Sequence, residues 1–368
     1  MTEERNKFIK NLFLAGGAGL LALAGGAWLL KACAPREETV EDPAEDPEKE
    51  VDKKPGYARL EEEGKLTSKI EEAYSILEKC ELCPRRCREN RIKGNKGFCR
   101  TTDKAVVRSR QPHFGEEIPL VGSNGSGTIF FSNCNLRCVF CQNYPIAHKG
   151  RGDEISDEDI AGMMLDLQRK GCHNINLVTP THVMPNILNA TRIAYKNGLN
   201  LPLCYNTSGY ERKEVIQLLD GIVDIYLPDL KFMDGEKAAR YNKAEAEDYP
   251  EMAKKAIKEM HRQVGVLKTD ENYIAQKGLM IRHLVMPNRA SNPLEFVDWV
   301  AENLPKDTYV NIMDQYRVEF EAFEYDKIAR SITSEEYVEV MEHAKEVGLT
   351  NLDERSLGQY EIHLQRMD

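Results

Sequence analysis

The chain carries three closely spaced cysteines in the stretch Ser132-Asn133-Cys134-Asn135-Leu136-Arg137-Cys138-Val139-Phe140-Cys141-Gln142-Asn143. Their spacing is Cys-x3-Cys-x2-Cys. Three thiolates on one short loop can hold three irons of a [4Fe-4S] cube and leave the fourth iron without a protein ligand. That iron is then open to a substrate or cofactor. The alternative is a structural zinc loop, which would need a fourth ligand and a closed tetrahedral site.

This loop resembles that of the radical S-adenosylmethionine (SAM) superfamily. In that superfamily the amino and carboxylate groups of SAM chelate the free iron, and an electron from the cluster cleaves the sulfonium to give a 5'-deoxyadenosyl radical. Phe140, aromatic and directly before the last cysteine, fits the same pattern. The resemblance implies that Cys134, Cys138 and Cys141 are the catalytic cluster ligands and that a reductant protein of the flavodoxin or ferredoxin type supplies the electron.

The composition is that of a globular protein of 368 residues, with 41% hydrophobic and 30% charged residues. A formal net charge of -10 provides no basic face, so no nucleic-acid partner is expected. Seven of the ten cysteines fall into two tight groups with metal-ligand spacing, which argues against a disulfide framework. Of the isolated ones, Cys172 and Cys204 are expected to be buried as small hydrophobic side chains.

Residues 1–35 read as a membrane or export segment. Arg5, Lys7 and Lys10 precede the apolar stretch 12–30, which is close to the length that crosses a bilayer as a helix. The beginning is similar to a twin-arginine signal whose second Arg is Asn, and the residues up to Cys33 are similar to a lipoprotein cleavage box. A buried amphipathic helix is the alternative. The expected localisation is therefore membrane-associated.

The side of the membrane stays open. More positive charge before the apolar stretch than after it would leave the remainder of the chain outside, whereas SAM and low-potential electrons are cytoplasmic supplies. Residues 36–56 are rich in Glu, Asp and Pro and cannot bury enough apolar surface to order themselves, so they are expected to form an extended linker.

Residues 57–124 are expected to contain a helix over 57–79 and then a four-cysteine element. Four thiolates within twenty residues make a closed site that suits structural Zn2+ or a second [4Fe-4S] cluster, and spacing alone does not separate the two. Unpaired structural cysteines are the remaining alternative. The same element precedes the catalytic core in proteins that resemble pyruvate formate-lyase activating enzyme. The ligands of this second metal would be Cys80, Cys83, Cys87 and Cys99.

Residues 125–368 show strands alternating with helices, which predicts an α/β fold with a parallel sheet covered by helices. Chemistry in such a sheet collects at the carboxyl ends of the strands. The resemblance makes this an open, partial (β/α)6 barrel with the cluster near its top. The strands are expected at 128–131, 174–178, 201–205, 222–227, 280–286 and 308–312, and the helices at 157–170, 183–196, 212–219, 250–263, 293–303 and 334–347.

Polar residues follow several of these strands. The resemblance implies that Asn206 and Thr207 face the SAM carboxylate and ribose, and that Asp229 and Lys231 form the Asp-Leu-Lys element of the activating enzymes. A zwitterionic amino acid end needs both an acceptor and a cation, which these last two supply if their side chains share a face. The proposed cofactor-binding residues are Phe140, Thr179, Thr181, Asn206, Thr207, Asp229 and Lys231.

The loop after the second strand is Thr179-Pro180-Thr181-His182, where the activating enzymes commonly have Gly-Gly-Glu, so the roles of its two threonines rest on position alone. His182 is expected at the mouth of the barrel. His113 is expected either to contact substrate or metal or to be a hydrogen-bonded core residue. Glu116 and Glu117 are expected to be capping or solvated carboxylates.

Taken together, the sequence predicts a membrane-tethered radical SAM enzyme that cleaves SAM reductively and abstracts hydrogen from a substrate. That substrate is either a glycyl-radical enzyme, as the resemblance suggests, or a small molecule or modified peptide. The alternative function is a non-catalytic iron-sulfur protein for electron relay, which would need clusters and a docking face but no cofactor pocket.

Overall fold

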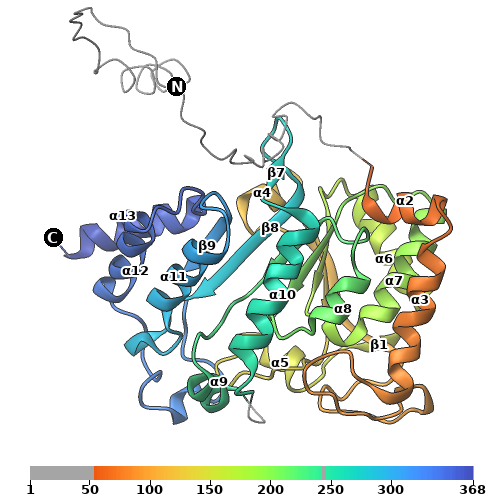
Figure 1. Cartoon of the computed structure of the whole chain (residues 1–368), viewed down its shortest axis with the longest axis horizontal. Coiled ribbons are helices and arrows are strands. Elements are labelled where there is room, and N and C mark those ends of the chain that lie inside the picture. Colours follow the sequence, from red (N-terminus) through yellow and green to blue (C-terminus); the bar gives the residue numbers. More distant parts are fainter. Residues whose placement is uncertain (1–53, 243–245, 368) are drawn as a thin grey trace, which may run out of the picture. The chain divides into compact units, whose positions relative to one another are not determined.

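The computed structural model describes residues 54–242 and 246–367 (Figure 1). Within these ranges nine strands form one sheet, and six of them, β2, β4, β5, β6, β8 and β9, run parallel. A helix follows each parallel strand and covers the sheet, so the predicted α/β alternation is confirmed. The two terminal parallel strands, β2 and β9, do not pair with each other in the described part, which leaves the sheet open.

The six parallel strands are mostly apolar and buried, as expected for strands covered on both faces, whereas the antiparallel β1, β3 and β7 carry polar, partly exposed residues. Their bounds are β1 (Ala105–His113), β2 (Ser126–Phe131), β3 (Asp153–Ile155), β4 (Ile175–Val178), β5 (Leu203–Thr207), β6 (Ile225–Pro228), β7 (Lys268–Thr269), β8 (Ala275–Leu284) and β9 (Tyr309–Met313). The largest shift from the predicted strands is in β8, because its first residues extend beyond the parallel pairing to form an antiparallel pair with β7.

The helices after the parallel strands lie close to the predicted ranges. They are α6 (Asp157–Arg169), α7 (Met184–Lys196), α8 (Lys213–Leu218), α10 (Tyr249–Val264), α11 (Pro293–Asn303) and α12 (Ser334–Glu346). Capping boxes fix two of their beginnings: Ser156 with Asp159 at α6, and Thr333 with Glu336 at α12. Sequence reasoning did not anticipate the short helices α4 (Ile118–Val121), α5 (Tyr144–Ala147) and α9 (Gly235–Tyr241), or the C-terminal α13 (Glu354–Met367).

The predicted helix over 57–79 is interrupted. Two α-helices, α2 (Gly56–Glu62) and α3 (Leu66–Ser75), are separated by Gly64, which has a φ of 71°. The amide of Lys65 donates to the carbonyl of Leu60 at 2.8 Å, which closes the first helix in the manner of a left-handed C-terminal cap. Figure 1 shows α2 and α3 lying beside α7, so this pair packs onto the outer layer of the barrel.

Strand β1 adds an antiparallel edge to the sheet, and its His113 lies opposite Ser126 at the start of β2. The residues after β1 therefore begin at the amino ends of the parallel strands, away from the cysteine loop at their carboxyl ends. The predicted membrane segment and most of the acidic linker lie outside the described residues. Among residues 54–242 and 246–367, no helix combines the length and apolar character that crossing a bilayer requires.

Candidate active site

The three-cysteine loop begins directly after β2, at the carboxyl end of the sheet. Asn133, just before the first cysteine, and Arg137, just before the second, have φ values of 74° and 60°, a conformation uncommon for residues other than glycine, and they turn the chain tightly there. Cys134 and Cys138 are buried and Cys141 is partly buried. Burial raises the pKa of the Cys138 and Cys141 thiols. Binding of a cationic centre must therefore supply the energy of their deprotonation.

One cavity of about 280 Å³ joins this loop to the ends of the parallel strands. Because residues from the ends of strands as far apart as β2 and β9 line the same cavity, the sheet must curve into part of a barrel. The lining includes all three cysteines of the loop and most of the predicted cofactor-binding residues. Prominent among its residues are Cys134, Cys138, Phe140, Cys141, Thr179, Asn206, Thr207, Asp229, Lys231, Arg282, Leu284, Met313 and Gln315.

Phe140 lies against a second aromatic side chain, Phe232, with ring centroids 5.9 Å apart in an edge-to-face arrangement. A third ring, that of Tyr316, has its centroid 6.3 Å from Phe140. This packing fixes an apolar wall next to the last cysteine of the loop. The predicted neighbourhood of Phe140 is therefore present in the structure, while its contact with a cofactor stays a prediction.

Asp229 and Lys231 meet after β6, as predicted for side chains on one face. The Lys231 ammonium donates to Asp229 Oδ2 at 2.6 Å. Sequence reasoning missed the residue that completes this group: Arg282 of β8 donates through Nε to Asp229 Oδ1 at 2.8 Å and through its terminal nitrogen to Asn206 Oδ1 at 2.6 Å. A charged residue within the apolar run Leu279-Met280-Ile281-Arg282-His283-Leu284 was the available signal.

The charges of this group stabilise one another. Burial alone would raise the pKa of Asp229, but Arg282 and Lys231 outweigh it and hold that pKa below its usual value. Burial alone would lower the pKa of Lys231, and the adjacent Asp229 and the nearby Cys138 reverse this effect. A charged acceptor and a charged donor are thus kept beside the cysteine loop at neutral pH.

The two threonines after β4 lie in different surroundings. Thr179 lines the cavity, whereas Thr181 is buried outside it and donates to Glu211 Oε1 at 2.5 Å. Thr207 also donates to that oxygen at 2.5 Å while lining the cavity. Burial raises the pKa of Glu211 to about 7. Thr181 therefore acts here by holding Glu211, and the structure does not bring it to the predicted cofactor-facing position.

Glu116 and Glu117 are neither solvated nor simple caps, so that prediction is wrong. They are 9% and 3% exposed, because the chain after β1 turns inward at the amino ends of the parallel strands. Arg282 faces both carboxylates, at 3.7 Å from Glu116 Oε2 and 3.9 Å from Glu117 Oε1. His113 Nδ1 lies 3.2 Å from Glu116 Oε1. A line of charges therefore runs through the barrel from His113 to Lys231.

Comparison with known proteins agrees with this arrangement. The family model described as "Radical SAM superfamily" matches residues 128–273, from β2 to the β7–β8 turn. An uncharacterized protein of Methanocaldococcus jannaschii is 32% identical over 293 residues, which cover 77% of this chain and 79% of the relative. The chain belongs to the radical SAM superfamily. A [4Fe-4S] cluster and SAM are the cofactors of that superfamily, and they supply an electron and a carbon radical when bound.

Two solved structures show a weaker similarity to this radical SAM protein. HydG, a maturase of the [FeFe]-hydrogenase, is 13% identical with a TM-score of 0.41, over 80% of this chain and 58% of the HydG chain. Methylornithine synthase (PylB) is 13% identical with a TM-score of 0.33, over 60% of this chain and 68% of the PylB chain.

The four-cysteine element of this radical SAM protein also forms a pocket. Cys80, Cys83, Cys87 and Cys99 line one small cavity together with Arg91 and His182. Arg91 is 1% exposed, and its guanidinium donates to the carbonyls of Thr102 and His182 and lies 3.8 Å from Cys80 Sγ. A buried cation beside four cysteines would offset part of the negative charge of their thiolates.

His182 was expected at the mouth of the barrel, and the structure shows otherwise. Its Nε2 lies 2.7 Å from the carbonyl oxygen of Ser132, just before the cysteine loop, and the ring is buried. Burial lowers the pKa of His182 to about 4, so the ring is neutral near pH 7. Because the turn after β4 folds back under the loop, His182 separates the two groups of cysteines.

Two hydrogen bonds attach the four-cysteine element to the cluster loop. Arg85 Nε donates to the carbonyl oxygen of Asn135 at 3.0 Å, and the Asn133 side chain donates to Thr101 Oγ1 at 3.3 Å. No three His, Cys, Asp or Glu side chains within 54–242 and 246–367 are grouped as they would be around a single metal ion. The second metal itself, and not only its identity, therefore stays a prediction.

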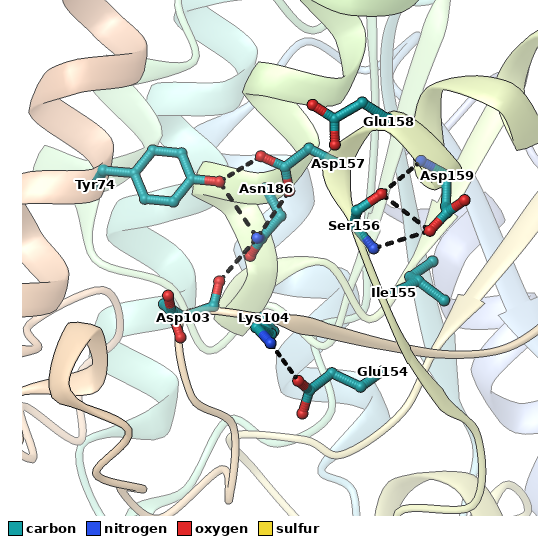
Figure 2. A pocket seen from close by; sticks show the side chains of 10 residues that line it. All are labelled: Tyr74, Asp103, Lys104, Glu154, Ile155, Ser156, Asp157, Glu158, Asp159 and Asn186. Atoms are coloured by element: carbon teal, nitrogen blue, oxygen red, sulfur yellow. Dashed lines mark hydrogen bonds and ion pairs between the residues drawn. The ribbon is translucent and has the colours of Figure 1, made fainter.

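A further polar hollow lies on the outer layer, away from both cysteine groups. Figure 2 shows Tyr74 of α3, Asp157 of α6 and Asn186 of α7 pointing toward one another. Tyr74 donates to Asp157 Oδ2 at 2.5 Å, and the Asn186 amide donates to Asp157 Oδ1 at 2.9 Å and to the carbonyl of Asp103 at 2.8 Å. These hydrogen bonds join the N-terminal helices to the barrel, which explains the hollow structurally.

Proposed function

We propose that this radical SAM enzyme cleaves SAM reductively at a [4Fe-4S] cluster on Cys134, Cys138 and Cys141, and that the resulting 5'-deoxyadenosyl radical abstracts a hydrogen atom from a substrate. One observation carries the proposal: a single cavity of about 280 Å³ contains the three cysteines of the loop and also Asp229 and Lys231. Three thiols suit three irons of a cube, and the charged pair suits the amino acid end of SAM.

In this proposal the residues of the cavity have separate roles. Asn206 and Thr207, on the end of β5, offer polar groups to the ribose and carboxylate side of the cofactor. Lys231 offers a cation, and Asp229 an acceptor for an ammonium. Phe140 and its aromatic neighbours exclude water from one side of the loop, which protects a reactive radical from the solvent. Thr181 supports this arrangement through Glu211.

The substrate in this proposal is a glycyl-radical enzyme or, alternatively, a small molecule or modified peptide. The electron comes from a reductant protein of the flavodoxin or ferredoxin type. The sequence resemblance supports the first substrate, and the small cavity with polar lining at the strand ends supports a small molecule. No nucleic acid takes part, since the chain has a formal net charge of -10.

The test is SAM cleavage by full-length protein, reconstituted anaerobically with iron and sulfide and reduced with dithionite. It should release 5'-deoxyadenosine and methionine slowly, and Cys138→Ala should release neither because two thiolates of the loop cannot hold a site-differentiated cube. The matched control is Cys172→Ala, a cysteine outside both groups, which should retain cleavage. Wild-type protein with a full, reducible cluster whose EPR signal does not respond to SAM would instead be an electron-relay protein.

We also propose that Cys80, Cys83, Cys87 and Cys99 bind a second metal, either Zn2+ or a second [4Fe-4S] cluster. The common pocket of the four cysteines and the buried Arg91 beside them support this. The test replaces Cys134, Cys138 and Cys141 together with Ala. After reconstitution this variant should keep about one zinc or about four irons per chain. Absence of both metals would mean that the four cysteines are only structural.

A further inference from the structure

A second cavity lies beside the proposed SAM pocket, along β9 and α13. Its volume is about 150 Å³, and it shares Arg282, Met313 and Gln315 with the larger cavity. An interior space of that volume accommodates a molecule about the size of benzene. Glu116 and Glu117 form its buried part, and Arg355 of α13, an exposed residue, lies at its rim. A ligand here would be small and would lie next to the bound cofactor.

The buried part of this cavity carries more negative than positive charge. Glu116 and Glu117 are the buried carboxyl groups of its lining, and Arg282 is the cation that faces both. Asp229 and Lys231 line the larger cavity, are partly buried and pair with each other. Arg282 commits its short contacts to Asp229 and Asn206, and it remains 3.7 and 3.9 Å from the two glutamates. His113 lies beside Glu116. Glu117 is therefore the carboxylate whose negative charge is least balanced by nearby cations.

Glu117 is also incompletely hydrogen-bonded. Its Oε1 accepts from the Asn311 side chain at 2.9 Å, whereas Oε2 is buried with no hydrogen-bond partner among the described residues. A buried carboxylate oxygen without a partner is costly, and a ligand that donates to it removes the cost. Burial raises the pKa of Glu117, and a cation at Oε2 would oppose that effect.

We infer that this cavity is the substrate chamber and that it takes a small molecule whose protonated amine binds Glu117. The inference deepens the proposed function, since the ligand would then be the hydrogen donor beside SAM. The two guanidinium nitrogens of Arg355 donate to the carbonyls of Gly115 and Phe114, and no carboxylate within the described ranges forms an ion pair with this residue. This rim cation leaves the far end of the ligand neutral or anionic, which excludes a polyamine.

The experiment measures binding of n-butylammonium and of its neutral counterpart n-butanol to the anaerobically reconstituted full-length protein by isothermal titration calorimetry. The amine should bind with a Kd of about 1 mM, as is reasonable for a ligand of five heavy atoms. n-Butanol should bind at least about tenfold more weakly, because it lacks the charge-assisted contact. Equal affinities for the two probes would overturn the inference.

Two variants locate the contact. Glu117→Gln keeps the acceptor for Asn311 but loses the charge, so it should bind the amine about 10-fold to 100-fold more weakly. Glu354→Gln makes the same change on an exposed carboxylate of α13 and should bind as the wild type does. Iron content and thermal unfolding show that each variant is folded. Unchanged binding by a folded Glu117→Gln protein would refute the site.

SAM cleavage is measured on the same preparations, so that the two proposals fail separately. If the wild-type protein cleaves SAM but binds n-butylammonium and n-butanol equally, the proposed function stands and the proposed substrate chamber is refuted. Amine binding that depends on Glu117 in a protein unable to cleave SAM keeps the binding site and refutes the role of its ligand as hydrogen donor.

Discussion

Replacing Arg282 with Met tests whether one guanidinium holds the interior of the barrel together. Arg282 donates to Asp229 at 2.8 Å and to Asn206 at 2.6 Å, and it is the nearest cation to Glu117. The change keeps much of the apolar stem but removes the cation that faces Glu116, Glu117 and Asp229, leaving Lys231 beside Asp229 and His113 beside Glu116. Removing one partner of a buried ion pair typically costs about 3–5 kcal/mol.

That loss is large compared with the total free energy of unfolding of a natural protein, about 5–15 kcal/mol. Arg282→Met should therefore lower the free energy of unfolding by about 3–5 kcal/mol at pH 7, measured by urea denaturation followed by circular dichroism. Arg366→Met, at the exposed end of α13, is the matched control and should change it by less than about 0.5 kcal/mol.

Two further measurements connect the effect to charge. Asp229→Asn combined with Arg282→Met removes the carboxylate to which Arg282 makes its shortest ion pair, so the double variant should recover about 1.5–3 kcal/mol relative to Arg282→Met alone.

The second measurement is the dependence of the free energy of unfolding on pH. In the wild type the pKa of Asp229 is depressed, so its stabilising contribution exists above the unfolded pKa and is lost as the pH falls through the folded pKa. Without Arg282 that contribution is smaller, because only Lys231 still lowers the pKa of Asp229. The difference between variant and wild type should therefore shrink below about pH 4. A loss under about 1 kcal/mol at pH 7, or no recovery in the double variant, would refute this account of Arg282.

Three other outcomes are expected. Burial raises the pKa of Glu211 from 4.5 to about 7, so its stabilising contribution is complete below pH 4.5 and is lost as the pH rises to 7, for a total of about 3 kcal/mol. Glu211→Gln should remove this fall between about pH 4.5 and 7 in denaturation curves, and an unchanged pH profile would contradict it. A Cβ on Gly97 would lie 2.8 Å from Cys87 Sγ, so Gly97→Ala should reduce the metal retained by the four-cysteine element. Gly358→Ala is the control and should retain the metal, because a Cβ there would have no atom within 4 Å. Equal metal contents in the two variants would show that the pocket tolerates the methyl group. Because the stretch 12–30 is long and apolar enough to span a bilayer, we propose membrane association. Full-length protein should sediment with membranes, while a chain starting near Tyr57 should not. A full-length chain that stays in solution with its N-terminus intact, shown by mass spectrometry, would exclude the membrane tether.

The parts of the fold that the sequence predicts are those that depend on patterns among residues close together in the chain. Alternating strands and helices between β2 and α12 have apolar periodicities within each segment, and the spacing of Cys134, Cys138 and Cys141 is a property of eight consecutive residues. The pairing of Asp229 with Lys231 is local as well, because residues two apart in extended chain share a face. Each of these features needs no knowledge of distant segments.

The features that sequence reasoning missed depend on contacts between distant segments. Arg282 meets Asp229 and Asn206 only because β5, β6 and β8 are neighbours in the sheet, an order that no local pattern encodes. His182 was placed at the mouth from its position after β4, but the turn directs it under the loop toward Ser132. Position relative to a strand end therefore does not fix the direction of a side chain within a turn.

The direction of β1 links the missed residues to the proposed chemistry. A parallel strand would deliver the chain to the cysteine loop, but β1 is antiparallel to β2 and delivers it to the opposite end of the barrel. Glu116 and Glu117 then enter the interior from below, where Arg282 lies between them and Asp229. The cofactor pocket is thus built from the carboxyl ends of the strands. The proposed substrate chamber is lined by residues 115–117, which precede the matched radical SAM region, and by residues of β8, β9 and α13 and of the segment after β9, which follow it. If the proposed chamber binds the substrate, substrate choice depends on these flanking residues and not on the cluster loop.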